Sequence, residues 1–234
     1  MQFQSIVILT GAGISAESGV DTFRDVGGIW SKVRLEDVAT PEGFARHPAM
    51  VHDFYNQRRA GLAGLHPNPA HLALARLERE FRGRFTLVTQ NIDDLHERAG
   101  SRQVVHMHGE LTRALCAHCG TRAAAPAALS TELACRQCGQ VQGMRPDVVW
   151  FGEMPYHMDL IYDRLAAADL FVSIGTSGAV YPAAGFVEDA RANGSRTLEL
   201  NLEPSAGTRL FSEARHGPAS RLVPDFVDEI LARR

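Results

Sequence analysis

Short runs of apolar and β-branched residues recur along the chain and predict the buried strands of a parallel sheet. The first, residues 3–10 (FQSIVILT), is nearly continuous, as in a strand that is covered on both faces. Similar runs lie at residues 85–89, 169–174 and 196–201, with helix-like stretches or loops between them. This alternation predicts an α/β fold with a Rossmann-like, doubly wound parallel sheet.

Two long connections interrupt this pattern and predict insertions. The first, between residues 10 and 85, contains residues 47–60 and 69–81, which carry apolar side chains at helical spacing. Pro48 and Pro69 suit the first turns of these two helices, where a backbone N–H is not needed. The second insertion, residues 113–145, holds an alanine-rich spacer typical of a loop with little core.

The composition is that of an ordinary globular domain, with 45% apolar and 22% charged residues. The 24 basic and 27 acidic side chains give a net charge of -3, so no overall basic field attracts nucleic acid. The longest apolar stretch near the start, residues 6–9, is too short for a signal sequence or a membrane span. We therefore expect a cytoplasmic protein that binds neither nucleic acid nor membranes, and a monomer is compatible with the sequence.

The four cysteines form two pairs with the same spacing, Cys116/Cys119 and Cys135/Cys138. Each pair offers two thiolates to one ion, and two pairs complete a tetrahedral zinc site. Four protein ligands leave no open position for a catalytic water, so the predicted zinc is structural. Taken alone, the pattern also suits a zinc-ribbon nucleic-acid binder, although the acidic balance of the chain counts against it.

A glycine-rich turn, Gly11-Ala12-Gly13-Ile14-Ser15, follows the first predicted strand directly. Glycines in this place let the backbone approach a pyrophosphate, although a lone turn of this kind is common. The acidic residue that a dinucleotide-dependent oxidoreductase carries after its second strand has no clear counterpart here. Hydride transfer is therefore a weaker alternative.

Polar groups also follow the other predicted strands. Residues 89–94 (TQNIDD) and 105–110 (VHMHGE) lie where a sheet of this type binds its ligand, so His106 or His108 could act as a base or be a structural histidine. Residues 175–178 (GTSG) and 201–203 (NLE) end two further strands. They suit phosphate or ribose hydroxyl groups, or they are plain helix caps.

Several segments together resemble the sirtuin family, in the family's order and over nearly the whole chain. They are residues 11–25 (GAGISAESGVDTFRD), 89–100 (TQNIDDLHERAG), 106–110 (HMHGE), the paired cysteines, 145–153 (RPDVVWFGE), 175–177 (GTS) and 201–203 (NLE). Residues 54–59 (FYNQRR) and 217–220 (GPAS) are similar to the lysine desuccinylases of bacteria and mitochondria.

The resemblance implies two domains with the active cleft between them. The expected Rossmann-like NAD-binding domain comprises residues 1–25, 66–112 and 146–234, and the small helical and zinc-binding domain comprises residues 26–65 and 113–145. The implied reaction transfers the acyl group of an acyl-lysine to NAD, which gives nicotinamide, free lysine and 2′-O-acyl-ADP-ribose. Mono-ADP-ribosyl transfer, which shares the first bond cleavage, is an alternative.

The resemblance also implies roles for individual residues. His108 matches the family's catalytic base and would deprotonate a ribose hydroxyl, for which it must be neutral. The residues expected to bind NAD are Gly11, Ala12, Gly13, Ser15 and Arg24 at the pyrophosphate and nicotinamide end, Gln90, Asn91, Ile92 and Asp93 at the nicotinamide ribose, and Gly175, Thr176, Ser177, Asn201, Leu202, Glu203 and Ala219 at the adenosine half.

The partners implied are proteins or peptides with an acylated lysine. Val148, Trp150 and Phe151 are expected to pair with the substrate backbone and enclose the lysine stem, although a simple buried strand would look the same. Tyr55 and Arg58, three positions apart on one helix face, match the pair that binds the terminal carboxylate of a succinyl or malonyl group. The alternatives are ordinary packing of this pair and an enzyme that is mainly a deacetylase.

Overall fold

The computed structural model describes residues 3–21 and 33–232. Its main sheet has six parallel strands in the order β3-β2-β1-β7-β8-β9. The strands are β1 (Ser5–Thr10), β2 (Arg84–Thr89), β3 (Val104–His106), β7 (Leu170–Ile174), β8 (Arg196–Asn201) and β9 (Glu213–His216). The four strands predicted from the apolar runs are β1, β2, β7 and β8, and the predicted fold class is confirmed.

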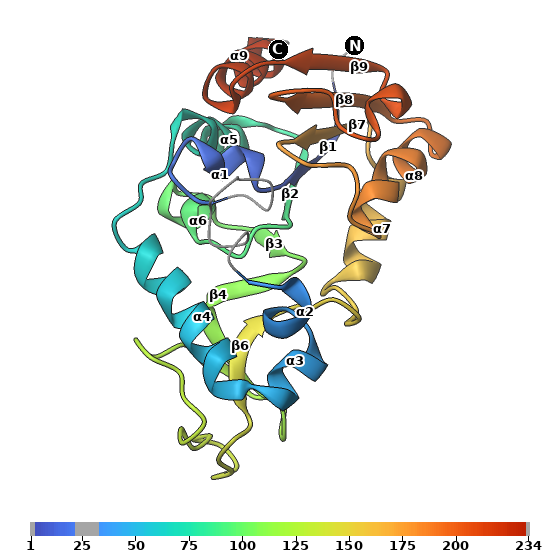
Figure 1. Ribbon diagram of the computed structural model, residues 1–234. Helices are drawn as coiled ribbons and strands as arrows, with labels where there is room; N and C mark the ends of the chain where they lie inside the picture. Colours follow the sequence, from blue (N-terminus) through green and yellow to red (C-terminus); the bar gives the residue numbers. More distant parts are fainter. Residues whose placement is uncertain (1–2, 22–32, 233–234) are drawn as a thin grey trace.

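Helices cover both faces of this sheet, as Figure 1 shows. On one face, Ile6 and Ile8 of β1 pack with α5 (Pro69–Glu80) and α9 (Ala219–Ala232). On the other, Val7 and Leu9 pack with α7 (Met158–Ala166) and α8 (Phe186–Ala192). Alternate side chains of β1 therefore enter two different cores, which explains why the strand is apolar throughout.

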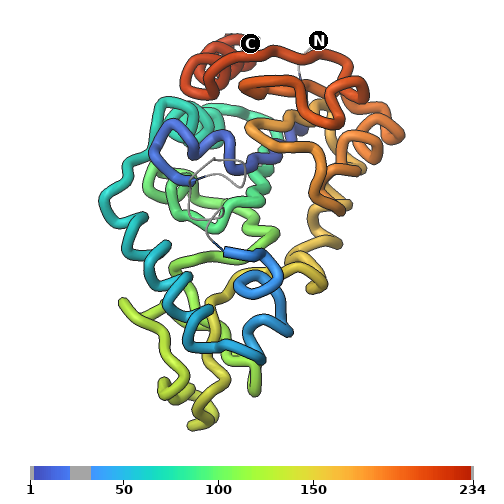
Figure 2. The backbone as a smooth tube through the Cα atoms, in the orientation of Figure 1, coloured from blue at the N-terminus to red at the C-terminus, as the bar shows by residue number. Residues whose placement is uncertain are grey.

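A second layer of the described chain lies beyond one edge of the main sheet, in the lower half of Figure 1. It contains the antiparallel strands β4 (Gly109–Cys116), β5 (Arg122–Ala124) and β6 (Met144–Val148), in the order β5-β4-β6. The helices α2 (Leu35–Val38), α3 (Pro41–Arg46) and α4 (Pro48–Leu62) lie beside it. Figure 2 shows that the chain enters this region twice, once in blue to cyan and once in green to yellow.

Both predicted helices of the first insertion are present, as α4 and α5, and each has its proline in the first turn. Strand β4 crosses the predicted domain boundary between residues 112 and 113, so the boundaries themselves stay a prediction. The spacer at residues 121–134 differs from the expected loop, because β5 lies within it and pairs with β4. Leu129 is buried there in a small core with two of the cysteines.

The remaining short elements are α1 (Gly13–Ala16), α6 (Leu95–Arg98) and the 3-10 turns η2 (Ala183–Gly185) and η3 (Thr208–Leu210). Among the described residues, no helix has both the length and the apolar character that a membrane span needs.

Candidate active site

The candidate site lies at the carboxyl edge of the main sheet, where the strand order reverses between β1 and β7. The chain runs outward from β1 through β2 to β3, and from β7 through β8 to β9. Ligands of open α/β sheets bind at such a switch point. The segments predicted to carry chemistry, residues 11–15, 89–94, 105–110, 175–178 and 201–203, lie at or directly after the carboxyl ends of five of these strands. The fold therefore brings them to one edge.

Two glycine turns from neighbouring strands pack directly on each other at this point. The Gly13 N–H donates to the Gly175 carbonyl at 2.8 Å, and a Cβ atom on Gly13 would lie 2.7 Å from the Gly175 Cα. Gly175 has φ +63°, which favours glycine. The glycines are thus needed for the contact between turns, as well as for any approach of a pyrophosphate. Arg24, predicted for the same end, lies outside the described residues.

A buried polar network links the first turn to the segment after β2. Ser15 Oγ donates to Asp93 Oδ2 at 3.1 Å, and Asn91 Nδ2 donates to Ser15 Oγ at 3.2 Å and to the Gly11 carbonyl at 3.1 Å. Asp93 also accepts from the Leu95 N–H at 3.1 Å, yet burial raises the pKa of its carboxyl group. The structure therefore joins four of the predicted cofactor-binding residues, Gly11, Ser15, Asn91 and Asp93, in one hydrogen-bonded cluster.

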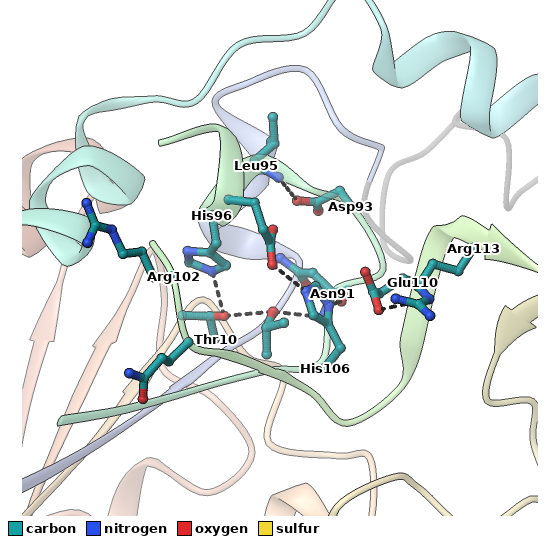
Figure 3. Close-up of polar contacts among 12 residues, drawn as sticks. Thr10, Asn91, Asp93, Leu95, His96, Arg102, His106, Glu110 and Arg113 are labelled. Atoms are coloured by element: carbon teal, nitrogen blue, oxygen red, sulfur yellow. Dashed lines mark hydrogen bonds and ion pairs between the residues drawn. The ribbon is translucent and has the colours of Figure 1, made fainter. Parts of the chain in front are cut away.

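Two further histidines support this network and were not predicted. His71 Nδ1 accepts from the Asn68 N–H at 3.3 Å, so His71 Nε2 is left to donate to Ser15 Oγ at 3.3 Å. His96 Nε2 lies 3.0 Å from Thr10 Oγ1 (Figure 3). Burial lowers the pKa of His71 to about 4, and it lowers the pKa of His96 as well. The spacing Asn68-x-x-His71 of a helix capping box was the available signal for the first.

His108 has the geometry of a neutral base. Its Nδ1 lies 3.1 Å from the Gln90 carbonyl. A carbonyl only accepts, so the proton is on Nδ1 and the lone pair is on Nε2. Burial lowers the pKa of His108, against the opposing effect of this hydrogen bond, so the imidazole is neutral at pH 7.

His106 is held differently. Its Nε2 lies 2.7 Å from Glu97 Oε1, and its Nδ1 lies 3.3 Å from the Asn91 carbonyl (Figure 3). Burial alone would lower the pKa of His106, but the hydrogen bond and charge of Glu97, with smaller contributions from Glu110 and Asn91, raise it. Both ring nitrogens face acceptors, so His106 is suited to hold a proton and serve as a structural ion pair.

The loops after β7 and β8 are joined by Asn201, whose Nδ2 donates to the Thr176 carbonyl at 2.8 Å. Ser177 Oγ accepts from the Ala179 N–H at 3.3 Å. The side chains of Leu202 and Glu203 are exposed, and Ala219 is the first residue of α9. Apart from Ala219, the residues predicted for an adenosine half thus lie at the ends of the adjacent strands β7 and β8, while some of their polar groups also serve as local caps.

Strand β6 connects the histidine with the predicted acyl-binding residues. Val148 pairs with Gly109, and the Val149 N–H donates to the His108 carbonyl at 2.9 Å. The next side chain, Trp150, is buried, and its Nε1 donates to Tyr55 Oη of α4 at 3.0 Å. Phe151 is 50% exposed.

Tyr55 and Arg58 lie on the face of α4 that is directed toward this site. Burial raises the pKa of Tyr55, so the phenol stays neutral. Burial lowers the pKa of Arg58, while the nearby charges of Asp93 and Asp21 raise it, and a guanidinium group remains protonated in proteins. A neutral donor and a cation therefore lie side by side near the Asp93 cluster.

The four cysteines fit a zinc ion. All four sulfur atoms lie within 4.8 Å of one another, with Cys116 Sγ 3.8 Å from Cys138 Sγ and Cys119 Sγ 3.7 Å from Cys135 Sγ. Sulfurs at about 2.3 Å from a tetrahedral zinc lie about 3.8 Å apart, so the cluster already has the right size. The ion's place is remote from the switch point, between β4 and the loop before β6, as expected for a structural metal.

Each cysteine pair forms the same turn. The Gly120 N–H donates to the Cys116 carbonyl and the Gly139 N–H donates to the Cys135 carbonyl, both at 2.8 Å, and both glycines have φ +73°. The sequence pattern Cys-x-x-Cys-Gly, which occurs twice, was the signal for this turn.

Comparison with known proteins agrees with this arrangement. Residues 11–182 match the family model described as the Sir2 family. The chain is 57% identical to an NAD-dependent protein deacylase of Caulobacter vibrioides over 231 residues, which is 97% of each chain. It is 56% identical to an NAD-dependent protein deacylase of Vibrio cholerae over 234 residues, which is 99% of this chain and 95% of the relative.

Solved structures show the same fold. A crystal structure of a Sir2 homolog in complex with NAD superposes with a TM-score of 0.89 at 37% identity, over 97% of this chain and 90% of that one. A Sir2 protein bound to acetylated peptide superposes with a TM-score of 0.80 at 25% identity, over 98% and 93% of the two chains.

Proposed function

This chain belongs to the Sir2 family and is an NAD-dependent protein deacylase, and we propose that it prefers lysines whose acyl group ends in a carboxylate, such as succinyl-lysine and malonyl-lysine. NAD is the co-substrate and one structural zinc is the metal. The observation that carries the preference is the pair of Tyr55 and Arg58, a buried neutral phenol beside a partly buried guanidinium.

The chain's own residues suit the deacylation reaction. NAD supplies a sugar carbon with a good leaving group, nicotinamide, so the protein needs no strong nucleophile of its own. The Asn91 and Asp93 cluster would orient the ribose, and the adjacent glycine turns would admit the pyrophosphate. His108, neutral and with a free Nε2 lone pair, would take the proton from a ribose hydroxyl.

The acyl preference follows from what the end of the pocket offers. A guanidinium donates two parallel hydrogen bonds to a carboxylate, and the Tyr55 hydroxyl can donate a third. An acetyl group ends in a methyl group, which accepts no hydrogen bond from these donors. In a partly dry pocket this contact contributes about 1.5–3 kcal/mol, which favours the acidic acyl groups.

The test compares kcat/KM on succinyl-lysine and acetyl-lysine forms of one peptide. We expect Arg58→Met to lower the value for succinyl-lysine by about tenfold to a thousandfold, with a much smaller effect on acetyl-lysine. Tyr55→Phe should act in the same direction, less strongly.

Arg59→Met is the matched control, because Arg59 is the next residue of α4 but donates to the Leu111 carbonyl at 2.8 Å and to Asn56 Oδ1 at 2.9 Å. Arg59→Met should change kcat/KM for both substrates by about the same factor. Equal losses on both substrates for Arg58→Met would mean that this pair only supports the fold, and the preference for acidic acyl groups would be withdrawn.

We further propose that the protein acts in the cytoplasm. Supporting this, the cysteines are arranged as four metal ligands and not as a disulfide framework, which fits a reducing compartment.

A further inference from the structure

The Tyr55 hydroxyl has one hydrogen-bond partner among the described residues, and that partner is a donor. Trp150 Nε1 donates to Tyr55 Oη at 3.0 Å, and both side chains are buried, with 1% and 2% of their surfaces exposed. A phenol has one proton to donate. Since the oxygen already accepts from Trp150, that proton must be directed away from the indole.

A buried donor without an acceptor is unfavourable. Among the described residues no acceptor is found for the Tyr55 proton, so a bound group that accepts a hydrogen bond would complete this site. Arg58 lies one helical turn further along α4 and adds a positive charge to the same region. Beside this charge, an anion with oxygen atoms, of the kind at the end of a succinyl group, would suit the Tyr55 proton better than a neutral acceptor.

The indole itself is fixed on three sides. The Arg145 guanidinium lies 3.5 Å from the centre of the Trp150 ring. Glu153 binds Arg145 at 2.6 and 2.8 Å and also accepts from the Trp150 backbone N–H at 2.8 Å. The Phe44 ring packs against the indole at 5.2 Å between centroids. Trp150 therefore presents its N–H in one direction only.

We propose that Trp150 is a specificity-determining positioning residue, whose indole N–H orients the Tyr55 hydroxyl so that its proton is donated to the terminal carboxylate of the acyl group. This role is separate from enclosing the lysine stem. It rests on the proposed preference for acidic acyl groups. Without the indole N–H, the hydroxyl is free to turn, and part of its hydrogen-bonding strength toward the carboxylate is lost.

The experiment uses one peptide with succinyl-lysine or butyryl-lysine, because these acyl chains have four carbons and differ at the terminal group. The readout is the ratio of the two kcat/KM values, since a loosened lysine channel lowers both values and leaves the ratio unchanged. We expect Trp150→Phe to lower the succinyl-to-butyryl ratio by about threefold to tenfold, the value of one neutral hydrogen bond.

A double-mutant cycle with Tyr55→Phe gives the decisive comparison. In the Tyr55→Phe background, Trp150→Phe should leave the ratio unchanged, because the hydroxyl that Trp150 orients is gone. Because phenylalanine is smaller than tryptophan, a second variant with benzothienylalanine at Trp150 keeps the ring size and removes only the N–H. It should lower the ratio like Trp150→Phe, and thermal melting checks that each variant is folded.

Two results would overturn the proposal. If Tyr55→Phe and Arg58→Met lower the ratio while both Trp150 variants leave it unchanged, the Trp150 side chain has only a packing role. The same conclusion follows if the effects of Trp150→Phe and Tyr55→Phe simply multiply. If Arg58→Met itself leaves the ratio unchanged, the preference for acidic acyl groups fails, and the role of Trp150 fails with it.

Discussion

Replacing His108 by alanine tests the assignment of the base most directly. The Gln90 carbonyl fixes the imidazole so that Nε2 carries the lone pair, and burial lowers the pKa so that the ring is neutral at pH 7. A positioned general base contributes about 10²–10⁴-fold to the rate. We therefore expect His108→Ala to lower kcat/KM by at least about a hundredfold, while the protein stays folded and keeps its zinc.

His106→Ala is the matched comparison, because His106 is two residues away and is buried, while His108 is half-buried. It pairs with Glu97, whose carboxylate is 41% exposed and can be hydrated when the partner is lost. The His106→Ala variant should therefore lose more stability than catalytic activity. We expect it to have the lower Tm of the two variants and the smaller loss of kcat/KM.

The two histidines should also respond to pH in opposite ways. The pKa of His106 is raised in the folded protein, so its pairing stabilises fully below the unfolded value of about 6.5 and is lost as the pH rises through the folded pKa. The Tm difference between wild type and His106→Ala should thus shrink at alkaline pH. The pKa of His108 is lowered, so the acid limb of kcat/KM should lie below about pH 6.5.

The assay is steady-state deacylation of one acyl-lysine peptide from pH 5 to 9, together with thermal melting and metal analysis of each variant. Near-normal turnover of His108→Ala, or a larger loss of kcat/KM for His106→Ala, would show that the base is assigned to the wrong residue.

Two further predictions concern the zinc and the glycine turns. Cys116→Ser or Cys135→Ser should lower the Tm and abolish deacylation, because the energy of metal binding is part of the folding energy; active protein with much less than one zinc per chain would contradict this. Gly13→Ala should lower the Tm and weaken NAD binding, measured by calorimetry, because its Cβ would lie 2.7 Å from the Gly175 backbone. Gly61→Ala, whose Cβ meets nothing within 4 Å on α4, is the control and should raise the Tm slightly, so equal effects of the two changes would refute the packing argument.

The sequence was sufficient to predict the elements whose signal is local. Strands β1 and β7 are apolar on both faces because α5 and α9 cover one face and α7 and α8 cover the other, so they appear as continuous runs. The cysteine pairs were equally clear, because each pair lies within one short turn. The positions of the polar segments followed from a general rule, since parallel strands end at the same edge.

Contacts between distant segments could not be predicted in this way. Strands β4 and β6 pair with a bulge, and β5 lies within an alanine-rich spacer, so neither pattern shows a clear period of two. The contact of Tyr55 with Trp150 joins residues 95 positions apart. The residue pattern alone left His106 and His108 as equal candidates and the family resemblance selected His108, while the structure adds that the His108 ring faces one carbonyl and the His106 ring faces two acceptors.

The glycine that follows His108 explains how the proposed base and Trp150 are held next to each other. Gly109 has φ +79°, and a Cβ atom there would lie 2.1 Å from the Asp147 carbonyl, so only glycine lets β6 approach this closely. The approach allows the Val149 N–H to bind the His108 carbonyl, which places Trp150 one residue beyond. Changes in β6 should therefore affect the proposed base and Trp150 together, whereas the proposed acyl-binding residues Tyr55 and Arg58 lie on α4. Acyl preference can thus change through α4 while the base stays in place, and for this reason a ratio of two substrates isolates their contribution.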